Sequence, residues 1–489
     1  MSESILSVLT FLPLAGAVLL LLLRTDQLAR WIALGTTVAT MAVCVLLYSQ
    51  FDPSTSALQF VESRDWIPAW NITYGMGVDG ISFPFLILAA LLSILCVSVS
   101  WTAVTTRVRE FHAALLITET AMLGLFLATN LFCFFVFWEL MVVPMFLLIG
   151  IWGGPARVYS AVKFLLFTLA GSVLMLVGMI ALYDTCGTLD FEELVGLSAE
   201  KLTPETQAWL FVAFLAAFAV KVPMFPVHTW LPHAHTEAPT AGSVILAGIL
   251  LKMGAYGFLR VSLPILPDAV ELFLNPMLAI SAVAIVYGAY LTLAQTDVKR
   301  LIAYSSVSHM GFVTLGIFTL SQTGVEGAIL QMINHGILSG ALFLCVGMIY
   351  ERTHTREIAD YGGVAKKAPI YATFMALFCL AATGFPGFNS FVGELLIVGA
   401  AFDASGWMGA LAIWGVVLGT TYMVWLFYRV IMGATNPGLE GMKLELGPRE
   451  ILTLAPLAVL AVALGLNPDL VLDLMRVSVT DLLAQGGTP

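Results

Sequence analysis

Long apolar runs alternate with short polar segments along almost the whole chain. The runs are continuously apolar, whereas the strands of a membrane β-barrel show segments of roughly ten residues with alternating polarity. A bilayer core about 30 Å thick is crossed by roughly 20 apolar residues in helical form. The pattern therefore predicts an all-α polytopic membrane protein. Its fourteen predicted transmembrane helices occupy residues 4–23, 31–50, 80–100, 111–129, 131–152, 161–183, 207–230, 241–262, 272–293, 300–320, 328–350, 370–400, 406–430 and 450–472.

Proline and glycine interrupt two of the predicted helices, the seventh and the twelfth. A proline inside a helix removes a backbone donor and clashes with the preceding turn. The first interruption, KVPMFP, begins at Lys221. The second lies in TGFPGFNSFVGE, which ends at Glu394 and has its proline and two of its glycines roughly two to three turns before that residue. Transporters place their sites at such discontinuous helices. The residues expected to break the helices are Pro223 and Pro226 in one, and Gly384, Pro386 and Gly387 in the other.

The two breaks lie five helices apart, which is the spacing expected of two five-helix repeats. We therefore predict four parts in the chain. Residues 1–105 would form helices one to three, 106–265 the first repeat (helices four to eight), 266–435 the second repeat (helices nine to thirteen), and 436–489 the last helix and a tail.

Positively charged residues indicate the orientation, because cytoplasmic loops carry an excess of Lys and Arg. With the N-terminus outside, fifteen of the 21 Lys and Arg residues fall in loops on the cytoplasmic side and four on the outer side. We expect a multi-pass protein of the inner (cytoplasmic) membrane with both termini on the outer (periplasmic) side. The fifteen are Arg24, Arg30, Arg107, Arg109, Arg157, Lys163, Lys299, Arg300, Arg352, Arg356, Lys366, Lys367, Arg429, Lys443 and Arg449; the four are Arg64, Lys201, Arg260 and Arg476.

Several ionisable residues lie inside the apolar runs. A charged side chain at mid-membrane costs roughly 2.5–3.5 kcal/mol on insertion scales, so such residues are functional candidates. A structural salt bridge, for example Glu139 with Lys221, would explain two of them and leave Lys252 and Glu394 unexplained. Acids and bases spread over several helices favour a proton relay instead. The set comprises Glu119, Glu139, Lys221, Lys252, Glu394, His309 and His335.

Composition and cysteine spacing argue against a cofactor on this chain. Hydrophobic residues make up 60% of the sequence and charged residues 11%, against roughly 25% charged in soluble domains, so the lipid bilayer is an expected partner. The net charge of −10 argues against nucleic acid. The six scattered cysteines lack metal-site spacing, and no glycine-rich phosphate loop occurs. Any redox chemistry is therefore expected in another chain.

The segment HTWLPHAHTEAP contains a possible metal-binding group, His228, His233, His235 and Glu237. Its spacing is not that of a common zinc motif, and Pro232 is expected to prevent a helical arrangement that would align these side chains. We predict no metal here, but a polar, hydrated junction at the cytoplasmic end of the seventh helix.

Four long motifs resemble one family, the M subunit (mitochondrial subunit-four type) of respiratory complex I. The resemblance implies fourteen helices with inverted five-helix repeats and broken helices seven and twelve. It also implies an antiporter-like subunit that carries protons while other subunits oxidise NADH and reduce quinone. The motifs are FWELMVVPMFLLIGIWGG, KVPMFPVHTWLPHAHTEAPTAGSVILAGILLKMGAYG, SSVSHMGFV and GFPGFNSFVGE.

The resemblance also implies roles and partners. NADH, FMN, iron–sulfur clusters and quinone are expected in partner subunits, and sister antiporter-like subunits are expected in the membrane. Glu119 matches the family less securely, and its role stays open. Glu139, Lys221, Lys252 and Glu394 match the family's charged residues of helices five, seven, eight and twelve, and His309 and His335 fall on connecting positions between them.

Two other functions remain open from the sequence. One is a subunit of a cation/proton antiporter or of a membrane-bound hydrogenase-type complex, where relatives tend to have lysine in place of Glu394. The largest sister pump also has a long lateral helix, which is not expected in the short tail after residue 472. The other is a proton-inert membrane spacer.

Overall fold

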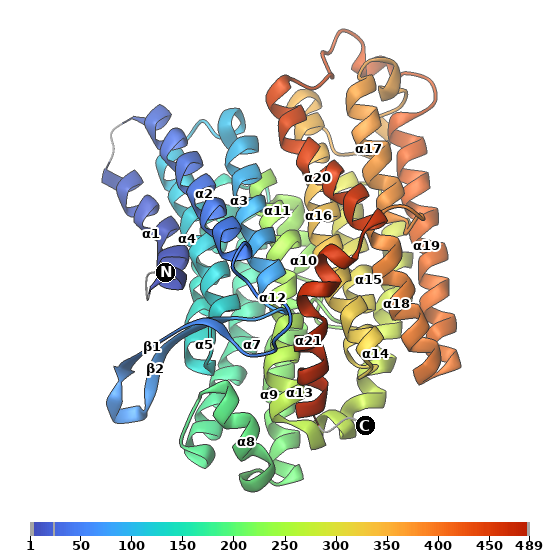
Figure 1. Ribbon diagram of the computed structural model, residues 1–489. Helices are drawn as coiled ribbons and strands as arrows, with labels where there is room; N and C mark the ends of the chain where they lie inside the picture. The colour runs from blue at the N-terminus through green and yellow to red at the C-terminus, as the bar shows by residue number, and fades with distance from the viewer. Residues whose placement is uncertain (1–3, 23–24, 487–489) are drawn as a thin grey trace.

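The computed structural model describes residues 4–22 and 25–486 as a bundle of long helices (Figure 1). Arg24, one of the cations assigned to the cytoplasmic side, lies outside the described residues. Within the described ranges, eleven helices are long and apolar enough to cross a membrane. This agrees with the predicted polytopic membrane protein.

The chain begins with four helices that pack against one another, with α1 against α4 and α2 against α3. They are apolar enough to span, and α4 carries one of the candidate carboxylates, Glu119. The four helices are α1 (Ile5–Leu22), α2 (Asp26–Tyr48), α3 (Phe83–Ala103) and α4 (Val108–Leu127).

A β-hairpin between α2 and α3 corrects the all-α prediction. Strands β1 (Gln59–Ile67) and β2 (Ile72–Val78) pair antiparallel around a short turn, η1 (Pro68–Trp70). The buried carboxylate of Glu62 accepts a hydrogen bond from the backbone N–H of Leu6 at 2.6 Å, in the first turn of α1. Because helix N-termini favour negative charge, this contact anchors the hairpin. The strands are short and contain both polar and apolar residues, so the search for long apolar runs did not detect them.

The middle of the chain continues with helices α5 (Leu131–Leu140), α6 (Val142–Trp152), α7 (Arg157–Cys186) and α8 (Phe191–Lys201). Asp190 caps α8 by accepting from the backbone N–H of Glu192 at 3.0 Å. Figure 1 shows the hairpin and α8 at one end of the bundle, called here the hairpin end. Because Lys201 of α8 donates to Cys186 O at 3.0 Å, α7 ends there and begins at the opposite end.

Helix α9 (Pro204–Lys221) stops where the first break was expected, and the next helix, α10 (Leu231–Glu237), begins ten residues later. The indole N–H of Trp230 donates to Val220 O at 2.9 Å and so satisfies one carbonyl freed at the end of α9. Pro232 lies in the first turn of α10, where proline is tolerated because that N–H has no helical partner. The expectation that Pro232 prevents a helix was therefore wrong.

The following span, residues 240–265, is helical but not uniformly α-helical. Two π-helical stretches flank the short α-helix that carries Lys252. Such bulges widen the helix by one residue and are frequent at functional sites. The pieces are α11 (Thr240–Ile245), η2 (Leu246–Leu250), α12 (Leu251–Gly257), η3 (Phe258–Ser262) and α13 (Leu263–Ile265).

The second half of the chain surrounds α16, which is buried from Gly324 to Ile349 without interruption. Helices α17 and α18 are separated by residues 383–388, where the second break was expected. The helices are α14 (Pro267–Leu293), α15 (Val298–Ile317), α16 (Gln322–Thr353), α17 (Pro369–Ala382), α18 (Asn389–Ala404), α19 (Gly406–Ile431), α20 (Pro448–Leu466) and α21 (Asp469–Gln485); the turns η4 (Ile358–Asp360), η5 (Val364–Lys366) and η6 (Pro437–Leu439) connect them.

The last helix, α21, was not predicted, because its mixed polar and apolar residues were assigned to a tail. The predicted run 450–472 instead ends at Leu466, and Pro468 separates it from α21. Helix α21 packs on α16 and α3. Its Ser478 hydroxyl accepts from the backbone N–H of Gly80 at 3.2 Å.

A two-pronged ion pair joins α16 to α20. Arg352 donates to Glu450 Oε1 at 2.8 Å and to Oε2 at 2.6 Å. Both prongs are charge-assisted hydrogen bonds of a planar guanidinium to a carboxylate, which is the strong geometry for such pairs. The contact fixes the end of α16 away from the hairpin.

Helix α16 lies so close to η2 that only glycine fits at one contact. A Cβ added at Gly336 would lie 2.6 Å from Leu88 Cδ2 and 2.9 Å from Gly248 O. One turn further along α16, a Cβ added at Gly340 would meet Leu92 and Val244 at 3.4 and 3.6 Å, which is ordinary packing distance.

We therefore predict that Gly336→Ala destabilises the protein and Gly340→Ala does not. Overpacking of a filled interior costs about 1–3 kcal/mol, and here it would push α16 away from η2. The measurement is the thermal unfolding midpoint of both variants in detergent. Equal midpoints for the two variants would contradict the close contact at Gly336.

Candidate functional site

Four of the predicted site residues form one connected row through the second half of the bundle. Lys252 on α12 contacts His335 on α16, His335 lies beside His309 on α15, and His309 lies beside Glu394 on α18. All four are buried, with exposed fractions of 7% or less. Four separate helices therefore bring ionisable groups into contact inside the bundle.

Lys252 is held at one end of the row by two acceptors. Its Nζ hydrogen bonds to His335 Nδ1 at 2.6 Å and to the carbonyl of Ala247. Ala247 lies five residues earlier, within the π-helical stretch η2. Within residues 4–22 and 25–486, Lys252 forms no ion pair with a carboxylate, and its Nζ contacts a carbonyl oxygen and an imidazole nitrogen instead.

The two histidines link the ends of the row. Their ring centroids are 5.6 Å apart, and a small cavity of about 10 Å³ is lined by both together with Ser305, Gln331 and Ser339. That volume is about what one water needs. A single water between the rings could connect nitrogen atoms that do not touch directly.

Glu394 occupies the other end of the row, beside the second break. Its Oε1 lies 3.4 Å from His309 Nδ1 and accepts from Gln331 Nε2 at 3.1 Å and from Ser390 Oγ at 3.2 Å. Its Oε2 lies against Gly384, which has φ +67° and where a Cβ would approach to 2.6 Å. The break therefore gives the carboxylate room next to the backbone.

Polar side chains of α16 contact the start of α18, directly after the second break. The side-chain amide of Asn334 donates to Asn389 O at 2.8 Å, and Gln331 Nε2 donates to Ser390 Oγ at 2.9 Å. These amides join α18 to α16 next to the row.

Glu139 and Lys221 lie close enough to interact electrostatically but form no ion pair within 4.0 Å. The Lys221 ammonium lies over the Trp138 ring, 4.8 Å from its centroid. Neither Lys221 Nζ nor Glu139 Oε1 has a hydrogen-bond partner. A tight structural salt bridge between the two is therefore not present.

Lys221 nevertheless borders the helix that carries Lys252. A Cβ at Gly254, two residues after Lys252, would lie 2.7 Å from Phe218 O and 3.0 Å from Lys221 Cβ. This close approach of α12 to α9 brings the break in the first half next to the row. Glu119, by contrast, lies on α4, fully buried, and none of the described residues forms an ion pair with it.

The three histidines and Glu237 after the first break do not converge on a common point. His228 packs with Tyr287 at 5.5 Å, His233 with Tyr159 at 5.5 Å, and His235 stacks on Phe343 at 4.8 Å between ring centroids. Within residues 4–22 and 25–486, no group of three His, Cys, Asp or Glu side chains is placed to hold a metal ion. The predicted polar junction is instead packed, since His228 and His235 are at most 3% exposed.

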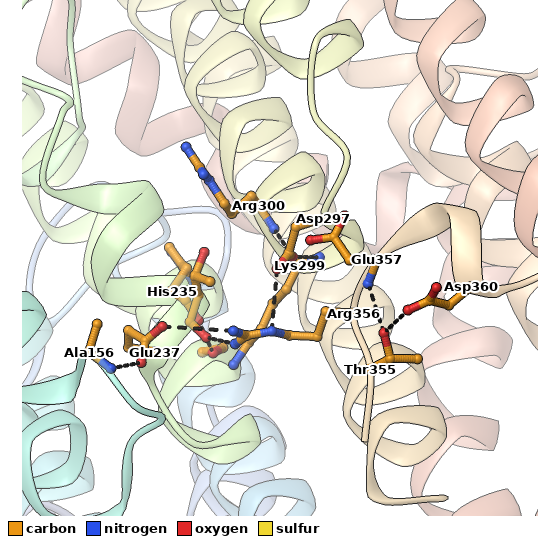
Figure 2. Close-up of polar contacts among 12 residues, drawn as sticks. Ala156, His235, Glu237, Asp297, Lys299, Arg300, Thr355, Arg356, Glu357 and Asp360 are labelled. Atoms are coloured by element: carbon orange, nitrogen blue, oxygen red, sulfur yellow. Dashed lines mark hydrogen bonds and ion pairs between the residues drawn. The ribbon is translucent and has the colours of Figure 1, made fainter. Parts of the chain in front are cut away.

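Sequence reasoning missed several residues of the site. Gln331, Ser390 and Tyr422, whose hydroxyl lies 3.4 Å from His309 Nε2, are uncharged, so they carried no signal inside apolar runs. Asp297, Lys299 and Arg356 were assigned to loops, but they form a cluster with Glu237 (Figure 2), in which Asp297, Lys299 and Glu237 are buried and Arg356 is partly buried. The interrupted hydrophobicity at 294–299 was the available signal.

A larger cavity of about 390 Å³ lies elsewhere, at the hairpin end. Asp79, Tyr256 and Arg260 line it, and Arg260 pairs with Asp79. Arg260 Nε also donates to the Tyr256 hydroxyl at 3.0 Å. The charges of Arg260 and Asp79 satisfy each other, and the two other acidic residues that line this cavity, Glu192 and Asp481, are not buried as those of the row are.

Chemically, the row contains amine, imidazole and carboxyl groups in sequence, each able to bind and release a proton. Imidazole can accept at one nitrogen and donate from the other. The arrangement therefore suits proton transfer along a buried path.

Comparison with known proteins identifies the family. The sequence matches the family described as NADH:quinone oxidoreductase/Mrp antiporter, TM, over residues 128–419, more than half of the chain. NADH-quinone oxidoreductase subunit M of Rhodobacter capsulatus is 48% identical, over 98% of this chain and 96% of that protein.

Solved structures agree with this assignment. A chain of respiratory complex I from Thermus thermophilus with bound NADH superposes with a TM-score of 0.87 at 30% identity, over 98% of this chain and 99% of that chain. A chain of the Mrp complex from Dietzia sp. DQ12-45-1b has a TM-score of 0.88 at 21% identity, over 99% and 98% of the two chains, which shows a shared fold alone. The chain belongs to the family of NADH-quinone oxidoreductase subunit M, the antiporter-like membrane subunits of complex I.

Proposed function

We propose that this chain carries protons across the membrane through Glu139, Lys221, Lys252, His335, His309 and Glu394, driven by quinone reduction in other subunits. The observation that carries the proposal is the buried row from Lys252 to Glu394, in which four helices contribute adjoining ionisable groups. Burial of such groups is costly, and no single ion pair accounts for them.

We further propose fourteen spans in two inverted five-helix repeats. The eleven candidate spans are supplemented by α15 and by the interrupted pairs α9/α10 and α17/α18. The repeats would be residues 106–265 and 266–435, preceded by 1–105 and followed by 436–489. The excess of Lys and Arg in alternate loops supports both termini on the outer side of the inner membrane.

The unpaired geometry of Glu139 and Lys221 suits a switch. Two unit charges about 7 Å apart at an effective dielectric near 20 interact by roughly 2.4 kcal/mol. Moving one charge against 100 mV costs roughly 2.3 kcal/mol. Approach of Glu139 would therefore hold the proton on Lys221, and its withdrawal would release the proton toward Lys252.

From Lys252 the proton would pass to His335 through their 2.6 Å contact and on to His309, with a water in the small cavity between the rings. Glu394 would receive it from His309 and release it outward, because Gly384 leaves the carboxylate beside the second break. A carboxyl group gated by access to water can change its protonation as its surroundings change.

The redox cofactors of the reaction, NADH, FMN, iron–sulfur clusters and quinone, are proposed to bind partner subunits. Sister antiporter-like subunits and the lipid bilayer are the expected neighbours of this chain. The alternative is a cation/proton antiporter or membrane-bound hydrogenase-type complex. Sodium-dependent transport by the purified chain would favour that alternative, and copurification with flavin and iron–sulfur subunits would favour complex I.

We predict that Glu139→Gln abolishes proton pumping and the quinone reduction coupled to it. Loss of about 2.4 kcal/mol of switching energy corresponds to roughly a fifty-fold slower step. Lys221→Ala should behave likewise, and NADH oxidation by an artificial acceptor should survive. The control is Glu110→Gln, an exposed acid in the first turn of α4. Normal pumping by assembled Glu139→Gln and Lys221→Ala complexes would refute the relay.

We predict that Lys252→Arg slows pumping although it keeps the charge. A guanidinium does not release its proton in proteins, so transfer to His335 would stop at this position. Lys201→Arg, which alters a lysine on α8 outside the row, should pump as the parent does. Proton uptake by inverted membrane vesicles measures both, and parental rates for Lys252→Arg would leave Lys252 a structural cation.

We predict that Glu394→Gln blocks proton release, whereas Glu394→Lys retains part of the activity because lysine can also bind and release a proton. Asp403→Asn, an exposed carboxylate on the same helix, is the matched control. The measurement is pumping and coupled quinone turnover in assembled membranes. Full activity of Glu394→Gln would mean that protons leave by another route.

A further inference from the structure

Arg356 holds together segments that are far apart in the sequence (Figure 2). Its Nη1 donates to the carbonyl of Thr236 at 2.5 Å, and its Nη2 lies 3.8 Å from Glu237 Oε1. Its Nε lies 3.3 Å from Asp297 Oδ2. One side chain therefore contacts both the end of α10, after the first break, and the start of α15, in the second half.

The end of α10 is buried, and its carbonyls need donors from outside the helix. The last carbonyls of a helix have no partner within it, and positive charge is favourable there. Here the donors come from three different segments, two of them in the second half of the chain. They are Arg356 to Thr236 O at 2.5 Å, the backbone N–H of Gly154 to Glu237 O at 2.8 Å, and Lys299 Nζ to Ala238 O at 2.5 Å.

Arg356 is itself fixed to the start of α15. Asp297 caps that helix by accepting from the backbone N–H groups of Lys299 at 2.7 Å and Arg300 at 2.9 Å. The backbone N–H of Val298 donates to Arg356 O at 2.9 Å. Side chain and backbone together make Arg356 a rigid link between α15 and α10.

The link bears directly on His235, which lies on α10 two residues before Glu237. Its ring is fully buried and stacks on Phe343 of α16 with an interplanar angle of 3°. Neither ring nitrogen has a hydrogen-bond partner. The ring interacts electrostatically with Lys299, Lys252 and His335. A shift of α10 would therefore move an unpartnered imidazole relative to the row.

We propose that Arg356 is a positioning residue for proton transfer: by binding the end of α10 to the start of α15, it holds His235 in place against α16, the helix that carries His335. The proposal rests on the proposed function, because the placement of His235 matters only if protons pass along the row. Arg356 takes no part in the transfer itself and acts through α10.

Two variants test the link while preserving the fold around it. Asp297→Asn removes the charge facing Arg356, and asparagine remains as good a helix cap as aspartate. Arg356→Lys keeps the charge, but an ammonium lacks the planar fork that reaches Thr236 O and Asp297 together. We expect both to slow pumping and coupled quinone reduction by about tenfold or more, since a misplacement of about 1 Å can cost about a hundredfold. NADH oxidation by an artificial acceptor should be unchanged.

Arg352→Lys is the matched control. Arg352 lies four residues earlier and forms an even closer arginine–carboxylate contact, but it joins α16 to α20 rather than to α10. Its conversion to lysine should lower the thermal unfolding midpoint while pumping continues at the parental rate. An equal loss of pumping in Arg352→Lys would show that weakening any such contact suffices, and would overturn the assignment to Arg356.

A double variant asks whether Arg356 acts through His235. If it does, Arg356→Lys in a His235→Gln background should slow pumping no further than His235→Gln alone. Independent, multiplicative losses would overturn the proposal, as would parental pumping in both Arg356→Lys and Asp297→Asn. If neither Arg356→Lys nor Asp297→Asn assembled, the contacts of Arg356 would be needed for folding, and the proposal would also be overturned.

The same measurements separate this inference from the proposed function. Suppose that Glu139→Gln and Lys221→Ala stop pumping while His235→Gln and Arg356→Lys pump normally. The proposed proton path would then be supported, and the positioning role of Arg356 would be contradicted. If the Glu139 and Lys221 variants pump normally, the relay itself falls.

Discussion

The main constraint on this structure is the free-energy cost of burying ionisable groups away from water. A buried charge without a partner is strongly unfavourable, and a polar group without a hydrogen bond costs roughly 1–3 kcal/mol in proteins. Hydrogen bonds inside the bundle offset much of this cost. Lys252 bonds to a carbonyl and an imidazole, and Glu394 accepts from an amide and a hydroxyl. None of these four partners carries a permanent opposite charge.

The same constraint applies to the backbone at the helix breaks. Carbonyls and N–H groups freed inside a membrane need protein partners. Trp230 donates to Val220 O at the first break; near the second, Asn334 donates to Asn389 O and Gln331 to the Ser390 hydroxyl. These side chains therefore do two things at once. They make the interruptions tolerable, and they place Lys221 and Glu394, the charged residues next to the breaks, against the central helices.

The proposed proton path has close contacts in its second part and a looser pair of charges in its first part. The contacts from Lys252 to Glu394 are within reach of direct or single-water transfer, whereas Glu139 and Lys221 interact without touching. At the end away from the hairpin, Arg356, Asp297 and Lys299 tie the two halves together through short hydrogen bonds to backbone groups. The groups from Lys252 to Glu394 are held in place by direct contacts, whereas Glu139 and Lys221 are not in contact. This arrangement is consistent with the proposed switch at Lys221 acting on a fixed path from Lys252 to Glu394.

The sequence by itself determined the membrane class, most of the helix positions, both interruptions and the buried charges, because twenty-residue apolar runs and the ions within them are local signals. It did not reveal the β-hairpin, α21, or the uncharged partners Gln331, Ser390 and Tyr422, whose residue types are ordinary at their positions. It also assigned Asp297, Lys299 and Arg356 to loops, and only the tertiary structure showed them clustered at the end of α10. Those groups are brought together by helix packing between residues up to 120 positions apart, and a local pattern carries no information about which distant backbone carbonyl a side chain will find.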